Sequence, residues 1–119
     1  ILAASLMLVL PEIADSNPSK KLALDYIAAY EKLNGSKPAT FGANVYDAGL
    51  LLQQAIPVAA KKAKPGTKEF RAALRSAFET MGRTVVSHGV LNWTKDDHWG
   101  YTLETGVMLK VVNGDWKVE

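Results

Sequence analysis

Cysteine is absent from the 119 residues of the chain. This absence excludes disulfide bonds, thiolate catalysis and cysteine-based zinc sites, but it does not fix the compartment. An excess of one charge is also lacking, because 14 Lys and Arg against 12 Asp and Glu leave a net charge of +2. The basic residues are spread among acidic ones, and their largest cluster, Lys61, Lys62 and Lys64, is typical of a solvated helix end. We therefore expect no nucleic-acid partner.

Groups that carry chemistry are few. The two histidines, His88 and His98, match no common metal-ligand spacing with each other or with Asp96 and Asp97. The two aspartates, followed by Gly100, instead predict a polar turn. The serines occur in no nucleophile-elbow context, and there is no glycine-rich phosphate loop. We expect neither an enzyme nor a bound metal or cofactor.

Long hydrophobic runs are missing as well. The longest, residues 1–10, is broken only by Ser5 and is too short to cross a bilayer. It lacks the basic start and the small-residue cleavage site of a signal peptide. Residues 5–10 predict a strand buried on both faces, with a turn at Pro11. A chain that starts in a core strand indicates a piece of a larger protein.

What is present indicates one globular domain. The apolar fraction of 48% and the charged fraction of 22% are ordinary for a folded chain of this length. A helix is predicted over residues 18–33, with Asn17 as its N-cap. A second begins near Thr40, is expected to be buried on most sides, and should kink or end at Pro57. A third, capped by Thr67, has the clearest apolar periodicity.

The pattern changes to strands after Thr84. Gly89 marks a candidate bulge between β-forming residues, and Asn113-Gly114 is a strong hairpin signal. That turn sets Lys110 opposite Lys117 on a wet face. The other face, expected to be buried, carries Leu109, Val111, Trp116 and Val118. The order strand, three helices, hairpin strands predicts an α/β fold.

Four tyrosines are candidate ligand contacts, because their rings are apolar and their tips polar. Tyr26 and Tyr30 lie on the packing stripe of the first helix and favour a core role. Tyr46 lies near the start of a glycine-containing helix, where free backbone amides attract carboxylates. Tyr101 is the fourth.

Six segments in order carry a resemblance that spans nearly the whole chain. They are Leu-Val-Leu-Pro at 8–11, Asn17-Pro18 with the helix at 25–30, Pro38 to Ala43 leading to Tyr-Asp-Ala at 46–48, Phe-Arg-Ala-Ala-Leu at 70–74, His88 to Trp93 with Asp96 to Gly100, and the strands around Asn113-Gly114. The set resembles the C-terminal part of periplasmic substrate-binding proteins of the branched-chain amino-acid type.

The resemblance implies a type I periplasmic-binding-protein fold, in which two α/β lobes close on a ligand, with residues 1–119 as one partial domain. Tyr46 would then contact the ligand, with Phe41 and Asp47 shaping the pocket, while the remaining contacts would come from upstream segments. It further implies a periplasmic solute-binding component of an ABC importer, which captures an amino acid or an aromatic or aliphatic acid and docks on a membrane permease. A ligand-sensing regulatory domain is the alternative. The central sheet of the first lobe would be missing from this chain, so the apolar faces of the three helices would need another cover. This predicts a homodimer or pairing with an upstream segment.

Overall fold

The computed structural model describes residues 2–119, so Ile1, the first residue of the apolar run, lies outside the described part. Helices α1, α2 and α3 span Pro18–Asn34, Thr40–Ala60 and Lys68–Thr80. Strand β1 is Leu2–Ser5, and the C-terminal half adds β2 (Thr84–Val86), β3 (Gly89–Leu91), β4 (Gly106–Val112) and β5 (Asp115–Val118). None of the described helices is long and apolar enough to cross a membrane.

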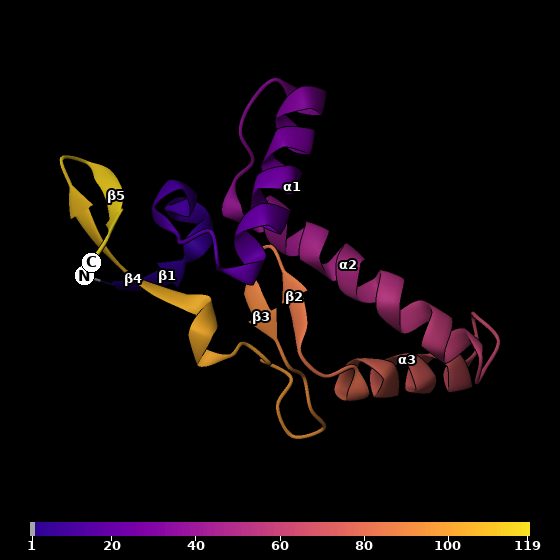
Figure 1. The fold of residues 1–119 in the computed structure, drawn as a ribbon. Coiled ribbons are helices and arrows are strands. Elements are labelled where there is room, and N and C mark those ends of the chain that lie inside the picture. Colours follow the sequence, from indigo (N-terminus) through magenta and orange to yellow (C-terminus); the bar gives the residue numbers. More distant parts are fainter. Residues whose placement is uncertain (1) are drawn as a thin grey trace.

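The strands form two small antiparallel sheets. One has the order β1-β4-β5, and the other is the β2-β3 hairpin. In Figure 1, β1 and the β4-β5 hairpin lie at one end of an elongated molecule of 53 × 34 × 23 Å, and both chain ends are close together there. Helices α2 and α3 run side by side to the other end. The β2-β3 hairpin lies between the two ends, against α1 and α2.

The prediction of a strand over residues 5–10 was wrong. The strand ends at Ser5, whose hydroxyl oxygen accepts a hydrogen bond from the Met7 amide at 3.2 Å. Two 3-10 turns follow, Leu6–Leu8 and Leu10–Glu12. The run is still buried, because Leu6, Val9 and Leu10 pack with Leu109 in one hydrophobic cluster. Apolar composition predicted burial correctly, but it does not distinguish a strand from a compact turn.

Helix α1 has the predicted start and stop. The Asn17 side chain accepts a hydrogen bond from the Ser19 amide at 2.9 Å, and Gly35 ends the helix in the left-handed conformation. Of the predicted packing stripe, Tyr26 is buried and Tyr30 is partly buried, and Ser19 and Ala23 complete the buried face.

Replacing Asn17 with alanine is expected to lower the free energy of unfolding by about 1 kcal/mol, because the Ser19 amide loses its capping partner. Urea denaturation followed by circular dichroism measures the change. Ser16→Ala, one residue earlier at an exposed position, is the control and should stay within about 0.5 kcal/mol of the parent. Equal losses in both variants would show that the cap contributes nothing specific.

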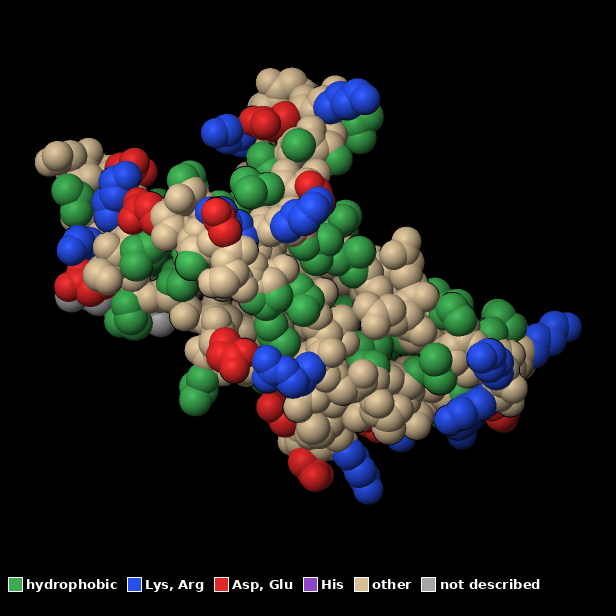
Figure 2. Space-filling view, in the orientation of Figure 1, with side chains coloured by type: hydrophobic (Ala, Val, Ile, Leu, Met, Phe, Trp, Pro, Cys, Tyr) green, Lys and Arg blue, Asp and Glu red, His purple; other side chains and the backbone are tan. Residues whose placement is uncertain are grey.

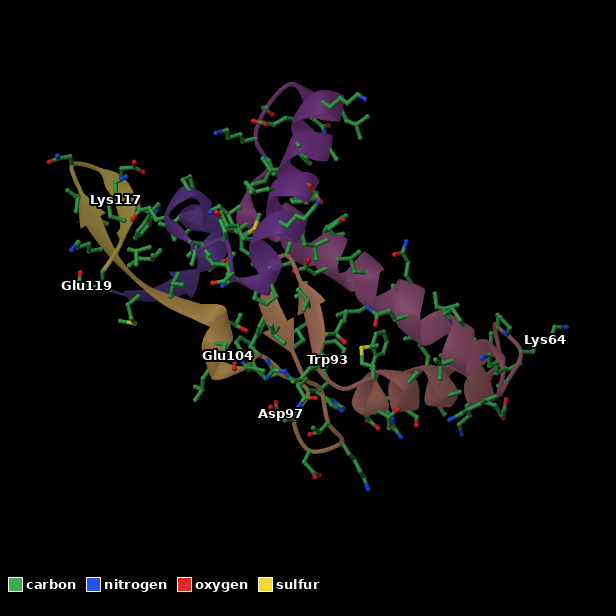
Figure 3. All side chains as sticks on the ribbon, viewed as in Figure 1. Lys64, Trp93, Asp97, Glu104, Lys117 and Glu119 are labelled. Atoms are coloured by element: carbon green, nitrogen blue, oxygen red, sulfur yellow. The ribbon has the colours of Figure 1, made fainter. Side chains whose placement is uncertain are left out.

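Helix α2 departs most from its prediction. It continues through Pro57 to Ala60 and buries only a narrow stripe, one residue in four: Ala43, Asp47, Leu51, Ala55 and Ala59. The wider apolar surface is open, with Phe41 80% and Val45 75% exposed. Figure 2 shows such hydrophobic side chains at the surface over α1 and α2, whereas basic side chains gather at the far tip of α2 and α3, where Figure 3 places Lys64. The chain therefore leaves one long helix half uncovered.

Helix α3 and the hairpins follow the sequence more closely. The Thr67 hydroxyl caps α3 by accepting from the Phe70 amide at 3.1 Å. The Asn113-Gly114 turn gives the predicted register, with Val111 opposite Trp116 and Lys110 opposite Lys117. Val111 is nevertheless 60% exposed, so the predicted buried face is covered only in part. Gly89 forms no bulge; it begins β3 directly after the Ser87-His88 turn.

Candidate functional site

The start of α2 presents an aromatic surface. Phe41 lies in its first turn with 80% of its surface exposed, and Val45 follows one turn later. Tyr46 is half-buried and stacks on Tyr26 of α1, with ring centroids 4.7 Å apart. No side chain caps this helix start, because its N-cap residue is Ala39. Free amide donors and an exposed ring thus lie together at the same end of α2.

Two helices meet closely behind this surface. A methyl group added at Gly42 would lie 2.7 Å from the Tyr26 hydroxyl oxygen, so this glycine permits the approach of α1 to α2. Gly49 has no atom within 4 Å of such a methyl and plays no comparable role. Burial raises the pKa of Tyr26, and the neighbouring Tyr30 and Asp47 raise it further. The Tyr26 phenol therefore stays neutral at physiological pH.

Asp47 does not share the outer surface of Phe41 and Tyr46, the two residues predicted to form the ligand pocket with it. It is 4% exposed and points away from solvent into the Ser87-His88 turn between β2 and β3. Its carboxylate accepts hydrogen bonds from the Ser87 amide at 2.8 Å, the His88 amide at 3.1 Å and the His88 Nδ1 at 3.0 Å. Asp47 thus fixes the turn against α2, while Phe41 and Tyr46 lie on the outer surface.

The same turn is held from α1. The Ser19 hydroxyl donates to the Gly89 carbonyl at 2.8 Å, across 70 residues of sequence. From the other side, the Thr105 hydroxyl donates to the Val90 carbonyl and accepts from the Val90 amide. Three polar side chains distant in sequence therefore converge on four consecutive residues, 87–90. Sequence reasoning missed this arrangement, since isolated serines, threonines and aspartates carry no pairing signal.

The Ser87-His88 turn also borders a pocket of about 680 Å³. His88 contributes to its wall together with Trp99 and Tyr101, which make an edge-to-face contact with centroids 5.5 Å apart. Burial raises the pKa of Tyr101, and the charge of Asp47 raises it further, so this phenol also stays neutral. Sequence reasoning singled out Tyr101 as a ligand contact but considered His88 only as a metal ligand.

Within residues 2–119, no three acidic or histidine side chains cluster in a way that would hold an ion. His98 instead contacts Glu79 at 3.0 Å, and Asp97 accepts from the Trp99 and Gly100 amides within the predicted polar turn. Figure 3 places Asp97 in this turn, next to Trp93 at the base of the β2-β3 hairpin.

No protein-family model and no curated protein matches the chain. Solved structures do. An extracellular ligand-binding receptor from Rhodopseudomonas palustris is 36% identical, with a TM-score of 0.85, over 98% of this chain. Two such receptors from strain HaA2 are 35% and 31% identical, each with a TM-score of 0.87, over 98% and 99% of the chain. The chain has the fold of the C-terminal part of an extracellular ligand-binding receptor. It spans 33% of the length of these receptors.

The comparisons confirm the predicted fold class, with three helices and two β-hairpins. They also agree with a ligand-binding role, since all three proteins are described as ligand-binding receptors. They do not name a ligand, a permease or a branched-chain specificity. The contacts predicted for Phe41, Tyr46 and Asp47 stay predictions.

Proposed function

We propose that the chain forms one wall of the binding site of a periplasmic solute-binding protein that serves an ABC importer. The supporting observation is the 31–36% identity to extracellular ligand-binding receptors across nearly the whole chain. In this proposal a second lobe closes over the start of α2 and holds a small molecule there. The whole protein would deliver its ligand to a membrane permease and would not act as an enzyme.

The start of α2 supplies the chemistry this proposal needs. The exposed Phe41 ring offers an apolar contact, and Tyr46 adds a ring held in place by its stacking on Tyr26. The uncapped amides of the first turn suit a carboxylate. Asp47 contributes indirectly, since its bonds to the Ser87-His88 turn fix the orientation of α2 beneath the ligand. An amino acid or an aromatic or aliphatic acid meets these requirements.

A titration of the 15N-labelled chain with leucine, benzoate and octanoate tests the proposal. Because a single wall provides few contacts, we expect weak binding, with a Kd of about 1 mM for at least one acid. Backbone amide signals of residues 40–47 should shift. Phe41→Ala should weaken binding about tenfold, because the ring loses roughly 1–2 kcal/mol of apolar contact.

Leu33→Ala provides the matched control. Its side chain is 84% exposed, like that of Phe41, but it lies in the last turn of α1, at the end that projects away from α2 in Figure 1. It should bind as the parent does. If no acid shifts the amides of residues 40–47, or if Phe41→Ala and Leu33→Ala behave alike, the start of α2 is not a ligand wall.

A further inference from the structure

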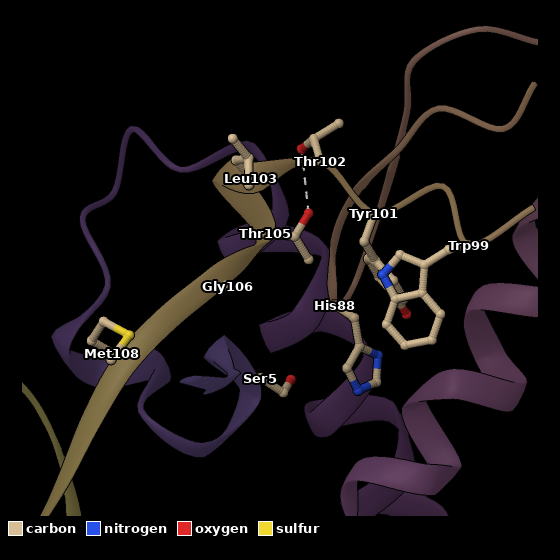
Figure 4. A pocket seen from close by; sticks show the side chains of 9 residues that line it. All are labelled: Ser5, His88, Trp99, Tyr101, Thr102, Leu103, Thr105, Gly106 and Met108. Atoms are coloured by element: carbon tan, nitrogen blue, oxygen red, sulfur yellow. Dashed lines mark hydrogen bonds between the residues drawn. The ribbon is translucent and has the colours of Figure 1, made fainter. Parts of the chain in front are cut away.

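The pocket behind the Ser87-His88 turn is separate from the start of α2. Three distant segments line it: the end of β1, the turn itself, and the stretch that leads from the polar loop into β4. Figure 4 shows the His88 ring projecting between the side chains of Ser5 and Trp99. The other lining residues are Tyr101, Thr102, Leu103, Thr105, Gly106 and Met108. Its volume of about 680 Å³ lies within the range of small-molecule sites.

One polar atom at this pocket lacks a partner. His88 is 6% exposed, and its Nε2 is buried without any hydrogen bond. The other ring nitrogen, Nδ1, lies 3.0 Å from the Asp47 carboxylate. Since a carboxylate only accepts, Nδ1 carries a proton, and this tautomer leaves the lone pair of the ring at Nε2. A buried acceptor left unpaired is costly, so this nitrogen calls for a hydrogen-bond donor.

The lining also restricts the rest of the ligand. The residues that line the pocket include no Lys, Arg, Asp or Glu, and His88 is the one basic side chain among them. A carboxylate or an ammonium group would therefore enter without a countercharge, at a large desolvation cost. Trp99, Tyr101, Leu103 and Met108 instead offer aromatic and aliphatic contact. These features favour a neutral molecule with an apolar body.

We propose that this pocket is a second binding site, which takes a neutral phenol or similar hydroxylated apolar molecule whose hydroxyl donates to His88 Nε2. Because Nε2 is buried, a lining side chain must turn aside to admit the hydroxyl. Asp47 acts as a positioning residue, since its bond to Nδ1 sets which nitrogen faces the ligand.

Two probes of nearly equal size, 4-fluorophenol and 4-fluorotoluene, isolate the hydroxyl and are followed by 19F NMR. We expect the phenol to bind the chain about tenfold more tightly, as a single net hydrogen bond of about 1.4 kcal/mol gives. His88→Asn keeps an amide nitrogen near the position of Nδ1 for Asp47 but has no Nε2. In this variant the two probes should bind equally. His88→Gln, whose longer side chain reaches toward the Nε2 position, should restore part of the preference.

Met108→Glu tests the pocket without touching the turn. Met108 is 50% exposed, so the variant should fold, and a carboxylate at the wall should weaken both probes. Phe41→Ala should leave both affinities unchanged, which separates this site from the proposed wall on α2. Equal binding of the two probes to the parent chain, an unchanged phenol preference in His88→Asn, or insensitivity to Met108→Glu would each overturn the proposal.

Discussion

Replacing Asp47 with alanine is expected to lower the free energy of unfolding by about 4 kcal/mol. The carboxylate accepts three hydrogen bonds in a buried position, two of them from backbone amides. Alanine removes all three acceptor contacts, and the Ser87 and His88 amides are left without a partner away from water. Because whole domains are stable by only about 5–15 kcal/mol, this loss should be visible as partial unfolding at room temperature.

Urea denaturation gives the size of the Asp47 effect, and hydrogen exchange gives its location. The amides of Ser87 and His88 should exchange faster in Asp47→Ala than the amides of α3. Asp47→Asn retains one acceptor oxygen and should lose about half as much. Asp25→Ala, at an exposed position of α1, is the matched control and should change the free energy by less than about 0.5 kcal/mol. A loss below about 1 kcal/mol in Asp47→Ala would show that the Ser87-His88 turn is stable without the Asp47 carboxylate.

Gly89→Ala is expected to cost about 3 kcal/mol. Gly89 has φ +144°, a region that residues with a side chain rarely adopt, and an added methyl would lie 2.3 Å from Thr105 Cγ2. Thr105 cannot turn away without breaking both of its bonds to Val90. Backbone strain and overpacking therefore act together at this position.

Gly49→Ala is the control for Gly89. It lies inside α2, and an added methyl meets nothing within 4 Å. Alanine should stabilise this helix by about 0.5–1 kcal/mol. Thermal unfolding of the two variants should therefore shift in opposite directions. A shift of the same sign in both would contradict the role assigned to the β2-β3 turn.

Local signals in the sequence predicted local structure well. Asn17 and Thr67 cap helices, and Asn113-Gly114 sets its hairpin register, because each signal acts within a few residues. The predicted helix end at Pro57 was wrong, because α2 continues for three residues beyond it, to Ala60.

The candidate site depended on partners that no local pattern reveals. Asp47 bonds to residues 40 and 41 positions away, and Ser19 to one 70 positions away. The apolar spacing of α2 predicted burial, but this chain supplies cover only for the stripe that includes Ala43 and Leu51. Phe41 was singled out by resemblance, and its exposure in the structure could not be derived from periodicity alone.

The pairing of β1 with β4 has a consequence for the order of folding. Leu2 pairs with Leu109, and the Val118 amide donates to the Glu12 carboxylate across 106 residues. Closing so long a loop costs entropy before any contact repays it, and on the ribosome β1 must wait until β4 has been synthesised. Until then the apolar residues at 6–10 lack Leu109, with which they pack in the finished molecule. Residues 6–10 therefore gain part of their cover late, only after β4 has formed.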